Sequence, residues 1–273
     1  MIPKLPLLFP HMYHVLEIQG GDKVSDGDCL VSERIDDHVV TLGFNQPDKR
    51  NALDLATVSE IDKALRVYSE EPTVLVLHST TPGMFVSGAD IAELRDRTAD
   101  DALRSINASL FDRLAAHRWP TIAAIDGYAL GGGCELAMAC DFRIATPTST
   151  FGQPELALGI LAGAGANWRL RELVGIAAAR RMLFLGERVD GTEAEALGLV
   201  DATVDADALI ECAIEYARRI SRNSWQAVEL TKLALAQNRP TTTSFDITAQ
   251  ALLFESDEKR ERMTRFLDRK NNK

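Results

Sequence analysis

Two glutamates lie among apolar residues in the middle of this 273-residue chain. Glu135 is followed by the apolar run LAMAC, and Glu155 comes directly after a proline in FGQPELALGI. A buried carboxylate is costly unless it is paired, hydrated or functional. Burial of two together raises the pKa of at least one, which suits general acid–base chemistry near neutral pH. The alternative interpretation is that each glutamate simply caps a helix.

A run of three glycines, 131–133, directly precedes Glu135. A buried strand is predicted over 121–126 and a helix after the glycines, so the run lies at the start of that helix. Glycine lets the backbone approach a ligand closely, and the first amides of a helix have no partner within it. Such N–H groups can stabilise an anion or a developing oxyanion. No Lys-Ser/Thr pair follows, which excludes a phosphate-binding P-loop; the alternative is a tight strand-to-helix turn.

The segment GMFVSGADIAEL, residues 83–94, is also predicted to connect a buried strand to a helix. It leaves a predicted buried strand, bends at Gly88 and enters a helix that Asp90 can cap. It therefore offers a second backbone N–H at a strand end, at Ala89. Ser87 is not part of a G-x-S-x-G motif and no His/Asp partner is identifiable, which favours a structural serine.

The elements that must position these segments follow an α/β pattern. The chain begins with a hairpin over 29–45, which turns at Asp36-Asp37. Apolar runs and helical periodicity then predict buried strands over 73–79, 121–127 and 142–147, and helices over 55–70 and 100–118. From about residue 164 onward the sequence is predicted to be mostly helical.

The composition of the chain argues against several classes of function. The net charge is −10 and no long basic stripe is present, which argues against nucleic-acid binding. No apolar run reaches the ~20 residues of a membrane span. The four cysteines form no CxxC pair and no zinc spacing, which favours a reduced, cytoplasmic location and no metal. An anionic ligand would need local basic residues.

Four segments together resemble those of the crotonase superfamily, the enoyl-CoA hydratase/isomerase family. They are NQPDKRNALD (45–54), FVSGADI, GYALGGGCELAMACD and FGQPE, and their order and spacing fit. The resemblance covers about residue 29 to the C-terminus. It implies an α/β fold, the crotonase-type ββα spiral, with two stacked sheets and helices outside. We expect a tail or edge over 1–27, the spiral core over 28–205 and a helical oligomerisation region over 206–273.

The resemblance also implies roles for the residues singled out above. The N–H groups of Ala89 and Gly132 would hold the thioester oxygen of an acyl-CoA and stabilise an enolate. One water would lie between the two glutamates. Glu135 would orient it and help to deprotonate it as it attacks the β-carbon, and Glu155 would deliver a proton to the α-carbon.

The presence of both glutamates favours a hydratase, because family isomerases generally keep only the second. The other possibilities are an enoyl-CoA isomerase, a hydrolase of an unusual acyl-CoA, or a non-catalytic acyl-CoA- or RNA-binding relative. No metal or redox cofactor is implied, since coenzyme A enters as part of the substrate. In the family the C-terminal helices cover a neighbouring subunit, so a homotrimer or homohexamer is expected.

Coenzyme A contacts are implied at two places. One is the loop with Lys49, Arg50, Ala52 and Leu53, and the other is the C-terminal helix near Phe266 and Arg269. The basic pair in the loop could also be a solvated turn. Further substrate contacts are expected at Ser87, Asp90, Ile91 and Trp168.

One segment departs from the family pattern G-x-x-P-G-x-G-G-[ST]-Q-x-L. Here it reads GILAGAGANWRL, with Ala162, Ala166, Asn167 and Trp168 in place of the proline, a glycine, the Ser/Thr and the glutamine. We expect Trp168 to add bulk to the acyl pocket, which would alter the choice of acyl group.

Overall fold

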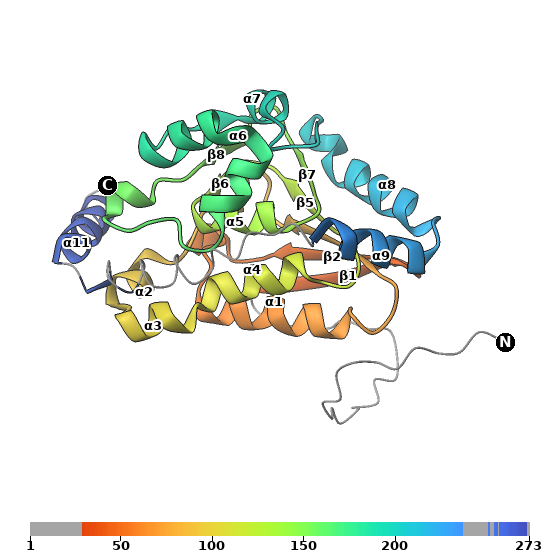
Figure 1. The fold of residues 1–273 in the computed structure, drawn as a ribbon, viewed down its shortest axis with the longest axis horizontal. Helices are drawn as coiled ribbons and strands as arrows, with labels where there is room; N and C mark the ends of the chain where they lie inside the picture. The colour runs from red at the N-terminus through yellow and green to blue at the C-terminus, as the bar shows by residue number, and fades with distance from the viewer. Residues whose placement is uncertain (1–28, 237–250, 252–253, 256, 272–273) are drawn as a thin grey trace.

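The computed structural model describes residues 29–236, 251, 254–255 and 257–271. The predicted tail over 1–27 lies outside the described residues. Two sheets form the centre of the molecule (Figure 1). The larger has the order β1-β2-β3-β5-β7-β10, and its strands are Leu30–Asp36, Val39–Phe44, Val74–Ser79, Thr121–Ile125, Phe142–Ala145 and Ala202–Thr203. The smaller has the order β4-β6-β8-β9, with Met84–Val86, Tyr128–Leu130, Thr150–Gly152 and Val189–Asp190.

The strands of the large sheet follow from their sequences. β2 is buried along its whole length and β5 likewise, as expected for apolar runs covered on both faces. β1 and β2 pair antiparallel as the predicted hairpin, whereas β2, β3, β5 and β7 pair parallel. The predicted strands therefore form the middle of this sheet.

The chain alternates between the two sheets. β3, β5 and β7 lie in the large sheet, and the strand after each of them, β4, β6 and β8, lies in the small one. Because β4, β6 and β8 pair parallel, their carboxyl ends meet at one edge. The segments that leave this edge begin at Ser87, Gly131 and Gln153. These are the three segments that the sequence singles out for chemistry.

Helices cover the sheets on both sides (Figure 1). α1 (Leu55–Val67) packs beside α4 (Ile106–Ala115), and their apolar faces join the main core. α8 (Leu209–Ser221) packs on the large sheet, where Leu209 and Ala213 join Val74 and Ile122 in a second core. α5 (Gly132–Ala139) is buried at every position, between α4, α6 (Ala166–Phe184) and the small sheet. α7 (Gly191–Leu197) and α9 (Trp225–Ala236) complete the outer layer.

Two features differ from the sequence prediction. The single helix expected over 100–118 is two helices, α3 (Ala99–Arg104) and α4, because Ser105 between them has a left-handed backbone with φ of 52°. The strands of the small sheet were not predicted individually, since two or three residues are too short for a periodic signal.

The C-terminal helix α11 (Asp257–Asn271) packs against α2 (Ile91–Asp96) and the 3-10 helix Glu155–Leu158. Phe254 and Met263 bury their side chains with Leu94 and Ile160. α11 therefore covers elements of its own chain, and the expectation that the C-terminal helices cover a neighbouring subunit stays a prediction. Among the described helices, none is long and apolar enough to cross a membrane.

Candidate active site

The backbone of Ala89 lies against Gly132 where β4 and β6 end. A Cβ atom added to Gly132 would stand 3.3 Å from the Ala89 nitrogen and 3.6 Å from Leu53 Cδ1. The turn before Ala89 depends on Gly88, whose φ of +113° is unfavourable for other residues. Gly132 is the first residue of α5, so its N–H has no partner within the helix. The structure thus brings together the two amides expected to form an oxyanion site.

The loop over 45–54 is attached to this site by its backbone. Leu53 N donates to Gly88 O at 2.8 Å, and Asp90 N donates to Leu53 O at 3.4 Å. The loop itself is held by the buried side chain of Asn51, which donates to Phe85 O at 2.8 Å and to Ser79 Oγ at 2.9 Å. Asn51 belongs to the NQPDKRNALD motif, but the sequence alone did not reveal the role of this residue.

Glu135 is held in one orientation by backbone amides. Its side chain is buried, and Oε1 accepts hydrogen bonds from Ala164 N at 2.8 Å and from Ala166 N at 3.0 Å. The altered segment after Glu155 thus positions the first glutamate.

Arg169 in turn holds that segment in place. Its buried guanidinium donates from Nη1 to Ala164 O at 3.0 Å and from Nη2 to Asp112 Oδ1 at 3.0 Å. Trp168 lies beside it, with its ring centre 4.3 Å from Arg169 Cζ. Trp168 is absent from the residues that line the pocket described below, which corrects the expectation that it adds bulk there.

Glu155 lies against the glycine run from the other side. A Cβ atom added to Gly131 would stand 2.6 Å from Glu155 Oε1. When the buried Gln153 amide is oriented with its nitrogen toward Glu155, it donates to Oε1 at 3.2 Å and to Oε2 at 3.1 Å. Burial, and then the nearby Glu135 carboxylate, raise the pKa of Glu155 to about 8. The raised pKa favours the protonated form of this carboxyl, which can donate a proton.

Both glutamates and both amide residues line one pocket of about 120 Å³, together with Ser87 and Ile91. The remaining predicted contact residues lie outside its lining: Lys49, Arg50, Ala52, Leu53, Asp90, Trp168, Phe266 and Arg269. The structure therefore unites the residues expected to do chemistry in one pocket, and Leu53 lies directly beside it at the Gly132 amide.

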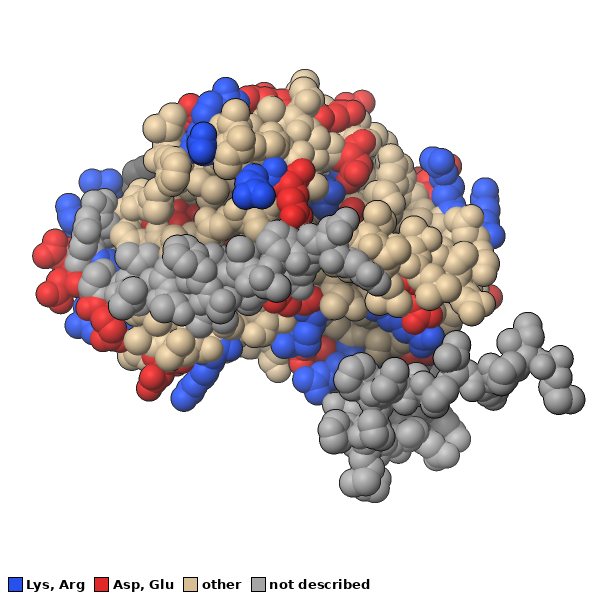
Figure 2. Space-filling model, in the orientation of Figure 1, with Lys and Arg blue, Asp and Glu red and all other residues tan. Residues whose placement is uncertain are grey.

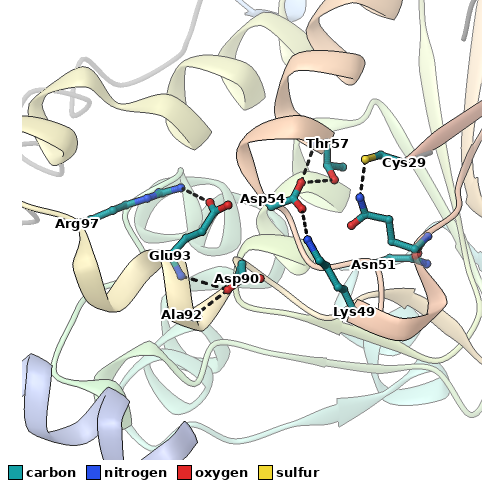
Figure 3. A network of polar contacts seen from close by, with 10 residues as sticks. Cys29, Lys49, Asn51, Asp54, Thr57, Asp90, Ala92, Glu93 and Arg97 are labelled. Atoms are coloured by element: carbon teal, nitrogen blue, oxygen red, sulfur yellow. Dashed lines mark hydrogen bonds and ion pairs between the residues drawn. The ribbon is translucent and has the colours of Figure 1, made fainter. Parts of the chain in front are cut away.

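Several of these outer residues have structural partners (Figure 3). Lys49 Nζ pairs with Asp54 Oδ2 at 2.8 Å, while Asp54 Oδ1 accepts from Thr57 N and so caps α1. Asp90 caps α2 by accepting from Ala92 N at 2.8 Å and Glu93 N at 3.1 Å. Arg50 is exposed, as are Phe266 and Arg269 on α11.

The family model described as enoyl-CoA hydratase/isomerase matches residues 34–273. The chain belongs to the enoyl-CoA hydratase/isomerase family. A crotonyl-CoA hydratase of Syntrophomonas wolfei subsp. wolfei is 37% identical over 243 residues, which are 86% of this chain and 94% of the relative. A short-chain-enoyl-CoA hydratase of Clostridium acetobutylicum is 35% identical over 240 residues, 85% and 92% of the two chains.

The fold is shared with solved members of the enoyl-CoA hydratase/isomerase family. The crystal structure of an enoyl-CoA hydratase from Bacillus anthracis is 32% identical, covers 88% of this chain and 96% of its own, and has a TM-score of 0.74. The resemblance to crotonases, the α/β fold class and the assignment as an enzyme are thereby confirmed.

Proposed function

We propose that this chain catalyses the reversible addition of water to a trans-2-enoyl-CoA. The observation that carries the proposal is that two glutamates and two backbone amide residues line the same pocket. Curated relatives named crotonyl-CoA hydratase and short-chain-enoyl-CoA hydratase support it.

The thioester oxygen would accept hydrogen bonds from the N–H groups of Ala89 and Gly132. These amides, of which that of Gly132 lies at a helix start, stabilise the negative charge that develops on the oxygen as the enolate forms. Glu135, fixed by the amides of Ala164 and Ala166, orients the attacking water and receives its proton. The water oxygen bonds to the β-carbon, and protonated Glu155 gives its proton to the α-carbon.

A double-bond isomerase needs only one acid–base group to carry a proton between two carbons. The present site has two carboxyls with different surroundings, one held by two amides and one with its pKa raised to about 8. This division suits hydration, which needs a base and an acid at the same time.

No metal or redox cofactor is needed in this scheme, since the thioester and the two amides provide the activation. We place coenzyme A at the exposed basic loop around Arg50 and at Phe266 and Arg269 of α11. On the face seen in Figure 2, the described acidic and basic side chains are interspersed, so that face offers no broad basic surface to a nucleic acid.

We further propose a homotrimer or homohexamer, located in the cytoplasm and acting in fatty acid metabolism. Support for assembly comes from large apolar side chains exposed on α9 and at the end of α6, namely Leu230, Leu233, Leu235, Phe184 and Leu185.

The test is a screen of the purified protein against trans-2-enoyl-CoA thioesters of increasing chain length. We expect loss of the absorbance of the conjugated thioester and formation of the 3-hydroxyacyl-CoA. A 3-enoyl-CoA reports isomerase activity, and release of free thiol reports hydrolysis. Thiol release or isomerisation without any hydration would contradict the proposal.

The raised pKa of Glu155 predicts a pH profile. The acid must be protonated to act, so kcat/KM for hydration should fall as pH rises through about 8, by about tenfold per unit above it. The measurement is kcat/KM for crotonyl-CoA between pH 5.5 and 10.

The Glu135→Gln variant provides the control for that profile. Removal of the neighbouring carboxylate should lower the pKa of Glu155, so the residual activity should fall at a lower pH than in the parent. A parent profile that stays flat up to pH 10 would show that no protonated Glu155 is required.

A further inference from the structure

One part of the pocket wall is polar, although an alkyl chain would need only apolar contacts there. It is formed by Arg97, Asp101, Ser105 and Asn107, which line the same pocket as the two glutamates. Arg97 directly follows α2, and only 14% of its side chain is exposed. Burial of a guanidinium carries a desolvation cost that contact with a methyl group does not offset.

The guanidinium of Arg97 has unused hydrogen-bonding capacity within the described part of the chain. Its ion pair is with Glu93, at 3.9 Å between Nη2 and Oε2, which is too long for a hydrogen bond (Figure 3). Burial lowers the pKa of Arg97, which the charges of Glu93, Asp101 and Asp90 oppose. An arginine has five N–H donors in a planar fork, so a ligand could still be bound in a bidentate manner.

The other acidic residues near Arg97 are occupied by helix caps. Asp101 Oδ2 accepts from Thr98 N at 2.9 Å and from Thr98 Oγ1 at 2.8 Å. Asp90 Oδ1 accepts from the first amides of α2. These carboxylates are therefore engaged with backbone amides rather than with the guanidinium.

Two further polar atoms at this end lack partners among the described residues. Ser105 Oγ and Asn107 Oδ1 are both buried without a hydrogen bond there. They come from the break between α3 and α4, where the left-handed Ser105 interrupts the helix. Unsatisfied buried polar groups cost free energy. The Ser105 hydroxyl can donate to a ligand oxygen as it stands, whereas Asn107 must turn its amide nitrogen toward the ligand to do so.

This end of the pocket is also fixed in place. Lys259 of α11 donates from Nζ to the Arg97 carbonyl at 2.9 Å, and its ammonium lies 4.9 Å from the centre of the Phe254 ring. Phe254 itself lines the pocket. The backbone of Arg97 is thereby tied to the C-terminal helix.

We infer that the acyl group of the substrate ends in a carboxylate, so that the substrate is the mono-CoA thioester of an unsaturated dicarboxylic acid. The inference rests on the proposed function and names its substrate class. Arg97 receives the terminal carboxylate in its guanidinium fork, and the Ser105 hydroxyl donates to the same oxygens. Asn107 donates there through its amide nitrogen when the amide turns that nitrogen toward the carboxylate. The alternative is that Arg97 only compensates the charge of Glu93.

The test compares matched thioesters of equal length. The parent should hydrate the mono-CoA thioester of trans-2-hexenedioic acid with a kcat/KM at least about tenfold above that of trans-2-hexenoyl-CoA, the effect of one charge-assisted hydrogen bond. Arg97→Met should abolish this preference, mainly by raising KM for the carboxylated substrate. Arg95→Met is the control, because Arg95 pairs with Asp96 outside the pocket lining, and it should keep the parental ratio.

Binding of saturated analogues separates this inference from the proposed function. By calorimetry, adipoyl-CoA should bind at least about tenfold more tightly than hexanoyl-CoA. To cover shorter chains, the binding of succinyl-CoA and glutaryl-CoA is compared with that of the alkyl-CoA of the same chain length. Asn107→Leu provides a second variant with similar size, and it should also reduce the preference. A binding preference without hydration would overturn only the proposed function. Hydration with no preference for any carboxylated chain, or a preference that survives Arg97→Met, would overturn the inference.

Discussion

Replacement of Glu155 by Gln is expected to lower kcat/KM for hydration by about 10²–10⁴, the usual contribution of one general acid or base. Glutamine keeps the size of the side chain but cannot deliver a proton to the α-carbon. The carboxyl lies beside Gly131 and within reach of the Gln153 amide, so the variant should keep its position. Kinetics with crotonyl-CoA, together with a thermal melt, measure the effect.

Glu135→Gln should cause a loss of similar size, and the double variant should lose less than the product of the two, because the residues act on one water. The assay with a 3-enoyl-CoA distinguishes an isomerase, for which Glu155→Gln would abolish activity and Glu135→Gln would leave much of it. Hydration by Glu135→Gln at the parental rate would contradict the two-glutamate mechanism.

Gly132→Ala should lower activity by about 10² or more, a loss like that of one oxyanion donor, because the methyl group keeps the thioester oxygen away from the two amides. The new methyl group would stand 3.3 Å from the Ala89 nitrogen, in the place the thioester oxygen needs. Its backbone is helical, a conformation that alanine also adopts, and the contact with the Ala89 nitrogen requires only a small local shift, so the fold should remain intact. The larger Gly132→Val should show at least the same loss.

The adjacent glycine supplies a matched comparison. A Cβ atom on Gly133 would stand 1.9 Å from Val86 O, so Gly133→Ala should disturb packing between α5 and β4 and lower the melting temperature. Gly132→Ala should leave the melting temperature near that of the parent. Near-normal turnover of folded Gly132→Ala would mean that Gly132 serves only as a turn residue.

Much of this arrangement is predictable from sequence because it depends on local signals. The apolar runs over 73–79 and 121–127 predict buried strands, and the hairpin over 29–45 follows from alternation and a polar turn. Ala89, Gly132, Glu135 and Glu155 lie in motifs at strand ends, and parallel strands bring such ends together.

Other parts depend on tertiary contacts that no local pattern reveals. Arg97 and Asn107 belong to polar stretches that are typical of a solvated helix face. The break at Ser105 places Asn107 at the start of a new helix, and α11 holds the backbone of Arg97 through Lys259. The role of Arg169 could not be predicted from local sequence either, because its partners Ala164 and Asp112 come from separate parts of the chain. Trp168 was expected in the pocket from its position in a motif, but it stacks on Arg169 instead.

The alternation of the chain between two sheets has a consequence for how this catalyst can change. Three strands of the small sheet are each followed by a different catalytic group. The amide of Ala89 follows β4, the amide of Gly132 and the side chain of Glu135 follow β6, and Glu155 follows β8. These groups are far apart in the sequence and come together where the parallel strands end. A substitution in the segment after β8 can therefore replace the acid Glu155 while the amides of Ala89 and Gly132 keep their geometry. The architecture separates activation of the thioester from the choice of proton transfer, so one scaffold can acquire a new reaction one loop at a time.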